Sequence, residues 1–188
     1  MNFAHDRLCS GRNWAEFVDG TLLPWALERL DLGDRVLEIG PGFGATTRVL
    51  ADRVPSLTVL ELEDRYCRKL TSELGDRVRI TQGDATQMPF ADGQFSAVLC
   101  FTMLHHVHTP QLQDRVLAEA ARVLKPGGAF AGTDSVGGSL RFKLLHIGDT
   151  LTLIEPARFP VRLTGAGLVE PEVEVQGGRM RFRAQRPG

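Results

Sequence analysis

The sequence predicts a single α/β domain in which five parallel strands and a C-terminal antiparallel hairpin form one seven-stranded mixed sheet flanked by helices. Three observations support this prediction. Short apolar runs alternate with segments of helical periodicity through the middle of the chain. A glycine-rich turn follows the first of these runs. Near the C-terminus, two segments of period-two alternation flank a Gly-Gly pair, which is the pattern of a β-hairpin.

The length and composition are those of an ordinary globular protein. At about 150 residues per domain, the 188 residues predict one domain over residues 1–188. A 43% share of hydrophobic and 24% of charged residues argues against disorder, collagen and coiled coil. No apolar run approaches the roughly 18 residues of a membrane span, and the first residues lack a signal-peptide core, so we expect a cytoplasmic protein. A net charge of -1 disfavours a general nucleic-acid binder.

The expected elements follow from periodicity. Residues 1–33 are expected to form a helical cap segment with a break at Pro24, and residues 34–188 the core. Short apolar runs bounded by turn residues predict strands over residues 35–39, 57–62, 78–81, 95–101 and 129–133. Helical spacing predicts helices over residues 45–54, 64–74, 112–124 and 140–151. This alternation predicts parallel strands with helices on both faces of the sheet.

The last two strands are expected over residues 171–176 and 179–184, joined by Gly177 and Gly178. The pairs in this register are Glu174–Arg181 and Glu172–Arg183 on one face, and Val175–Met180 and Val173–Phe182 on the other. Opposite charges and apolar residues both match, so the register is self-consistent. The charged face is expected either to be solvated or to form a contact between two copies of the chain in a homodimer.

The glycine-rich turn carries the strongest chemical signal. Residues 36–44 read VLEIGPGFG, a strand that runs into closely spaced glycines. Glycines let the backbone approach a ligand closely, and open α/β sheets bind nucleotides at the carboxyl end of the first strand. Glu38 lies within the apolar strand, where a buried carboxylate needs a cation or hydrogen bonds. Such a carboxylate repels a pyrophosphate and attracts an ammonium group.

Four motifs in order resemble those of class I S-adenosylmethionine-dependent methyltransferases, and more narrowly the small-molecule group related to the ubiquinone and menaquinone methyltransferases. The motifs are LEIGPGFG at 37–44, the acid Glu61 that closes the second strand, GDATQMPFADGQFSAV at 83–98, and LHHVHTP followed by RVLKPGG within 104–128. The resemblance implies a Rossmann-like fold. It also implies methyl transfer from S-adenosyl-L-methionine to a small-molecule acceptor by in-line displacement, with S-adenosyl-L-homocysteine as the product.

The same resemblance implies how the methionine part of the cofactor would be held. Gly40, Gly42 and Gly44 would pass under it, while Glu38 would organise this loop and the side that receives the ammonium group. Phe101, which ends the fourth strand, would offer its backbone carbonyl to that ammonium group.

The resemblance also assigns the nucleoside part. Glu61 would accept hydrogen bonds from both ribose hydroxyls, since a carboxylate has two oxygens for a vicinal diol. Glu63 is a nearby second candidate for this role. Leu62 would pack on the adenine, Asp84 would bind its amino group, and Ala85 would offer a backbone amide.

A general base is needed only when the acceptor is weakly acidic. His105 and His106 follow the fourth strand, and imidazole titrates near neutrality. Asp134 follows the fifth strand, where it would orient a histidine. The alternative is that one of these histidines is only a packed residue. We expect no metal, because adjacent residues of the H-H-x-H segment point apart and a fourth zinc ligand is not evident.

Two other readings remain open. A nicotinamide-dependent oxidoreductase would suit the glycine turn, but the only tyrosine is Tyr66, and Lys69 is one position short of a Tyr-x-x-x-Lys pair. The second is a non-methylating, cofactor-binding or pericyclic protein that has kept the fold. Nucleic-acid methylation is disfavoured, because no Asn/Asp-Pro-Pro-Tyr/Phe sequence follows the fourth strand. The acceptor pocket is expected between the N-terminal helices, the segment after the fourth strand and residues 137–151.

Overall fold

The computed structural model describes residues 11–137 and 150–188. Within these residues, seven strands form one sheet in the order β3-β2-β1-β4-β5-β7-β6. The strands are β1 (Arg35–Ile39), β2 (Ser56–Glu61), β3 (Arg79–Gln82), β4 (Phe95–Phe101), β5 (Leu124–Ser135), β6 (Val169–Gln176) and β7 (Arg179–Gln185). The first five are parallel, and β7 pairs antiparallel with both β5 and β6. The predicted mixed sheet is therefore confirmed.

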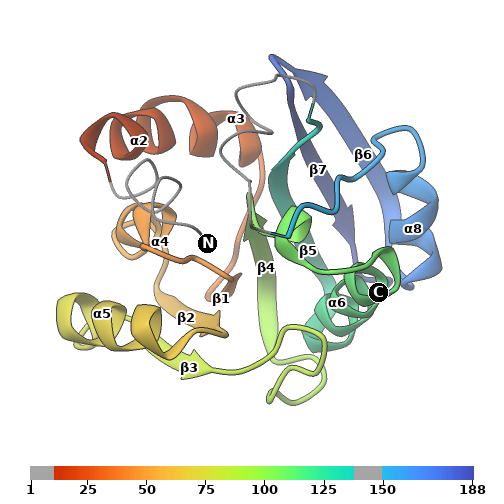
Figure 1. Ribbon diagram of the computed structural model, residues 1–188. Coiled ribbons are helices and arrows are strands. Elements are labelled where there is room, and N and C mark those ends of the chain that lie inside the picture. Colours follow the sequence, from red (N-terminus) through yellow and green to blue (C-terminus); the bar gives the residue numbers. More distant parts are fainter. Residues whose placement is uncertain (1–10, 138–149) are drawn as a thin grey trace.

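Helices cover both faces of this sheet (Figure 1). One face carries α2 (Arg12–Phe17), a π turn (Val18–Leu22), α3 (Leu23–Ala26), α4 (Ala45–Leu50) and α5 (Asp64–Leu74). The other carries α6 (Pro110–Val123) and α8 (Phe159–Gly165). None of the described helices is long and apolar enough to cross a membrane.

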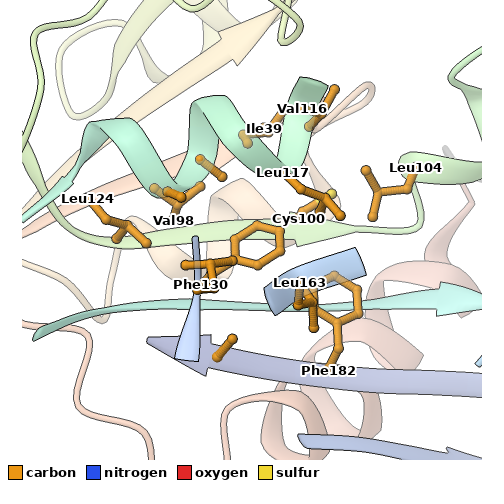
Figure 2. Packing of buried hydrophobic residues seen from close by; sticks show 14 of the residues in the cluster. Ile39, Val98, Cys100, Leu104, Val116, Leu117, Leu124, Phe130, Leu163 and Phe182 are labelled. Atoms are coloured by element: carbon orange, nitrogen blue, oxygen red, sulfur yellow. The ribbon is translucent and has the colours of Figure 1, made fainter. Parts of the chain in front are cut away.

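The core on the α6 side is built from aliphatic and aromatic side chains. Figure 2 shows Val116 and Leu117 of α6 next to β4, with Phe130 of β5 and Phe182 of β7 on the sheet below. The ring centroids of these two phenylalanines are 5.3 Å apart. Phe159 of α8 packs edge-on at 5.1 Å from Phe182. Both helices are thus held to the sheet by close aromatic and aliphatic packing.

The hairpin has the predicted register, with all four expected pairs in place. Its charged face packs against the end of the N-terminal helices. Arg181 Nη1 donates to the carbonyl of Trp25 at 2.6 Å and to Glu28 at 3.2 Å, and its Nη2 donates to Glu174 at 2.5 Å. Arg183 donates to the carbonyl of Glu28 at 3.3 Å. Cationic side chains here meet carbonyls at the C-terminal end of a helix, where the helix dipole favours them.

The predicted break at Pro24 is wrong, and the helix predicted over residues 45–54 already ends at Leu50. The helical segment continues through Pro24, because a π turn precedes it. In this turn the N–H of Leu23 donates to the carbonyl of Val18, five residues back. That wider turn relieves the clash that a proline ring makes with an α-helical turn. The predicted helix over 140–151 lies outside the described residues, except for Thr150 and Leu151, which are not helical. Helix α8 was not predicted.

The carboxyl ends of the parallel strands lie along one edge of the sheet. Backbone hydrogen bonds tie neighbouring ends together, from Gly40 N to Leu60 O at 2.8 Å and from Thr102 N to Thr133 O at 2.7 Å. Strand β5 extends to Ser135, so Asp134 lies within the strand instead of after it. This edge positions the predicted site residues.

Candidate active site

The turn after β1 has a backbone that only glycine adopts easily. Gly40, Gly42 and Gly44 all have positive φ, at 61°, 54° and 75°. A Cβ at Gly40 would lie 2.3 Å from Cγ of Met103, so the loop passes directly under the segment that follows β4. The three predicted glycines therefore form one left-handed loop that leads into α4.

Glu38 lies beneath this loop and is 1% exposed. Its carboxylate accepts hydrogen bonds from the hydroxyl of Thr46 and, at 2.7 Å, from that of Thr47, both on the first turn of α4. Burial raises the pKa of Glu38 to about 7, although the two threonine hydroxyls lower it; the charge of Glu61 raises it further. Glu38 thus fastens the start of α4 to β1.

Glu61 joins the end of β2 to the glycine loop. Its Oε2 accepts from Gly42 N at 3.0 Å and its Oε1 from Glu63 N at 2.9 Å. Burial raises the pKa of this carboxyl, while the backbone N–H groups of Glu63 and Gly42 lower it. Each carboxylate oxygen has a second lone pair, so both can accept one further hydrogen bond.

The other nucleoside candidates follow β2 and β3. Leu62 is 63% exposed and directly follows the buried Glu61. Gly83 N donates to Glu61 O at 2.9 Å, which brings the following Asp84 and Ala85 close to the end of β2. Asp84 is exposed, and its Oδ1 accepts from Thr86 N at 2.8 Å. The structure therefore groups Glu61, Leu62, Asp84 and Ala85 on one side of the glycine loop.

His105 and Asp134 form a buried pair on the other side of the loop. His105 Nδ1 lies 2.5 Å from Asp134 Oδ1, and the side chains are 3% and 0% exposed. Asp134 also accepts from the backbone N–H of His105 at 3.3 Å and of Ser135 at 2.6 Å. An ionised carboxylate only accepts hydrogen bonds, so the tautomer that suits this pair carries its proton on Nδ1. The ring centroid of His106 lies 4.1 Å from that of His105, with the two ring planes tilted by 42°.

Phe101 is buried at the end of β4 and is followed by a strained residue that the sequence did not reveal. Thr102 has a φ of 50°, a left-handed conformation that is uncommon for a β-branched side chain. Its N–H donates to Thr133 O, which locks β4 to β5 just before the histidines. Strain of this kind persists where the surrounding structure enforces it, and it is frequent at functional sites.

A cleft of about 340 Å³ lies elsewhere, between α3 and the hairpin. Its lining includes Ala26, Glu172 and Arg183 but none of the predicted site residues. Among residues 11–137 and 150–188, no three metal-binding side chains gather in one place. The candidate site is therefore the strand edge that holds Glu38, Glu61 and the His105–Asp134 pair.

Comparison with known proteins identifies the family. A family model described as "Methyltransferase domain" matches residues 37–132, just over half of the chain. The sequence is 39% identical over 108 residues to a fatty-acid O-methyltransferase of Mycolicibacterium smegmatis, covering 55% of this chain and 38% of that enzyme. It is 27% identical over 194 residues to ribosomal RNA small subunit methyltransferase A of Cupriavidus pinatubonensis, covering 91% and 68%. The chain spans about a third to a half of the length of several other curated relatives.

A solved structure shares the fold. The phosphoethanolamine N-methyltransferase 2 of Haemonchus contortus, solved with phosphomonomethylethanolamine and S-adenosylhomocysteine, superposes with a TM-score of 0.77 at 18% identity. The superposition covers 99% of this chain and 57% of that one. The matched sequence region contains the glycine loop, Glu38, Glu61 and the histidine segment. The chain therefore belongs to the methyltransferase domain family.

Proposed function

We propose that this protein transfers a methyl group from S-adenosyl-L-methionine to a small-molecule acceptor, leaving S-adenosyl-L-homocysteine. The observation that carries the proposal is the pairing of Glu38 and Glu61 around the left-handed glycine loop. The buried carboxyl group of Glu38 under the loop disfavours a diphosphate, which the nicotinamide alternative would require. Glu61 does not discriminate, since both cofactors carry a ribose diol. Family membership supports methyl transfer over a non-methylating protein of the same fold.

The residues fit this cofactor in chemistry and position. The positive φ of the loop glycines turns the backbone tightly from β1 into α4, Glu61 keeps acceptor capacity for a ribose diol, and exposed Leu62 offers an apolar surface for a base. Both oxygens of Glu38 already accept threonine hydroxyls, so we assign it the role of organising the loop. When bound, S-adenosyl-L-methionine supplies a sulfonium-activated methyl group.

We assign the general base to His105 and not to His106. The Asp134 carboxylate fixes the orientation and tautomer of the His105 ring, so that Nε2 can take a proton from a weakly acidic acceptor such as a hydroxyl. The developing imidazolium is stabilised by the same carboxylate. His106, half-buried against the His105 ring, contributes packing in this assignment.

Cofactor binding tests the first part of the proposal. Calorimetric titration should show that S-adenosylhomocysteine binds more tightly than NAD or NADP. Replacing Glu61 with alanine should weaken that binding by about 1.5–3 kcal/mol, the range for hydrogen bonds to a charged group. The exposed Glu16, changed to alanine, serves as the control. Tighter NAD or NADP binding would overturn the proposal, and an unchanged affinity in the Glu61 variant would move the ribose role to Glu63.

Acceptor assays test the second part. Radiolabelled methyl transfer is measured with fatty acids, hydroxylated aromatic and polyketide compounds, and ribosomal RNA, because relatives of this chain include a fatty-acid and a ribosomal RNA enzyme. Turnover with a small molecule supports the proposal. Turnover confined to RNA would show that the acceptor is a nucleic acid. A homodimer and a cytoplasmic location stay predictions, which gel filtration and cell fractionation would check.

A further inference from the structure

We infer that Gln113 is a positioning residue, which holds the backbone on both sides of His105 and so keeps the imidazole aligned. Gln113 lies in the first turns of α6, where its side chain is fully buried. It would act through His105, so this inference rests on the base role proposed above.

Gln113 occupies a core position that an apolar residue would normally fill. The sequence pattern places Leu112 on the buried face of α6, but the structure leaves Leu112 partly exposed and buries Gln113 completely. Its neighbours on that face are Val116 and Leu117. A buried amide costs free energy unless hydrogen bonds meet it, so this position calls for a specific set of partners.

The side-chain amide of Gln113 joins two separate segments. Its Nε2 donates to Leu104 O at 2.8 Å and to Thr152 O at 2.8 Å. Leu104 immediately precedes His105 and belongs to the same buried cluster as Val116 and Leu117 of α6 (Figure 2). Thr152 comes from the distant segment that precedes α8. One side chain therefore binds the histidine turn to a segment far away in the sequence.

The same contacts fix the two peptide units that flank His105. In the peptide before it, Leu104 O accepts from Gln113 while His105 N–H donates to Asp134. In the peptide after it, His105 O accepts from Thr152 N at 2.8 Å. Thr152 is held further by its hydroxyl, which donates to His108 O at 3.0 Å. Gln113 therefore holds the peptide before His105 directly, through Leu104 O, and the peptide after His105 indirectly, through Thr152.

The amide oxygen of Gln113 gives a second, independent observation. Among the described residues, Oε1 is buried and accepts no hydrogen bond. An unsatisfied buried acceptor is costly and rare in native structures. An apolar side chain would avoid that cost, so stability alone does not explain a glutamine here. The donation to Leu104 O and Thr152 O does explain it.

The experiment compares Gln113→Met with a matched control, Gln111→Met, on the exposed face of the same helix. Methionine keeps the length of the side chain and removes the donor. Both variants, and the wild type, are labelled with ¹⁵N-histidine and saturated with S-adenosylhomocysteine. The readout is the Nδ1 proton of His105, through its chemical shift and its exchange with water.

In Gln113→Met we expect this proton to exchange about tenfold faster than in the wild type, with S-adenosylhomocysteine affinity kept within about twofold. A factor of ten corresponds to about 1.4 kcal/mol, the scale of one hydrogen bond. Gln111→Met should behave as the wild type does. An unchanged Nδ1 signal in a folded, ligand-bound Gln113→Met protein would overturn the inference. If the wild-type protein itself does not bind S-adenosylhomocysteine, the proposed function is wrong, and this result is distinct from a failure of the Gln113 inference.

A measurement on the wild type covers the case in which Gln113→Met does not fold. If one side chain holds both segments, the amides of His105 and Thr152 should be protected from hydrogen exchange by the same opening event. Equal opening free energies for the two amides support the inference. Independent opening, with Thr152 exchanging much faster than His105, would contradict it.

Discussion

Replacing Glu38 with glutamine should change how the stability of the protein depends on pH. The carboxyl is 1% exposed, and burial raises its pKa from 4.5 to about 7. Between these two values the folded state keeps a proton that the unfolded state has released. The folded state therefore loses stability as the pH rises through this window, and the loss is complete above about pH 7.

The magnitude follows from the displacement of this pKa. A change from 4.5 to about 7 corresponds to about 3 kcal/mol, most of it lost between these two pH values. A glutamine is neutral throughout, so the variant should lack this dependence. At pH 8 it should be more stable than the wild type by about 1–2 kcal/mol, after subtraction of about 1 kcal/mol for a weakened bond to Thr46 or Thr47.

Urea denaturation at several pH values provides the assay, with the free energy of unfolding obtained by linear extrapolation. Glu16→Gln, at an exposed position on α2, controls for the general effect of removing one negative charge. Comparing the two variants cancels the titration of all groups that they share. If Glu38→Gln and the wild type have parallel stability curves, then the Glu38 charge is not desolvated as described, and the argument is wrong. On the same samples, S-adenosylhomocysteine should bind more weakly to Glu38→Gln.

Three further predictions concern the loop, the hairpin and the base. In urea denaturation, Gly40→Ala should lower the free energy of unfolding by about 2–4 kcal/mol and Gly177→Ala by only about 1 kcal/mol. Both glycines have positive φ, but only a Cβ at Gly40 would meet a neighbouring side chain. Equal losses in the two variants would show that this steric contact does not matter. Arg181→Met should lower the free energy of unfolding by about 1–3 kcal/mol in urea denaturation, because it removes the contacts with Trp25 O and Glu28, and the exposed Arg158→Met should lower it by less than about 0.5 kcal/mol. A larger loss in Arg158→Met than in Arg181→Met would contradict a stabilising contact between the hairpin and the N-terminal helices. Asp134→Asn should lower kcat about 100-fold or more while S-adenosylhomocysteine still binds, and full turnover would refute the dyad.

Most of the fold could be predicted from the sequence because its signals are local. The apolar run before the glycine turn predicts β1, and the matched charges of the last two strands predict a register that the structure reproduces pair by pair. Helix α8 could not be found in this way. Its seven residues begin at Phe159 with a proline next to it, and too few turns exist to show a period.

The candidate site also contains residues that local sequence signals reveal and contacts that only tertiary packing determines. Glu38, Glu61 and the glycines are predictable, since each stands out against an apolar strand or closes one. The contacts of Glu38 with Thr46 and Thr47 are not, because they depend on how α4 docks on β1. Gln113 was missed because helical periodicity favours the apolar Leu112 for the buried position. Tertiary hydrogen bonds decide that position, and sequence periodicity carries no information about them.

The arginine contacts between the hairpin and α3 have a consequence for folding. They join positions 156 residues apart, and β7 enters the sheet between β5 and β6. Loop closure over such a span is slow, so these contacts can form only after the last strand has inserted. Refolding should therefore end with one late step, in which strand insertion and burial of the indole of Trp25 occur together. A tryptophan fluorescence change in the slowest phase would report that step directly.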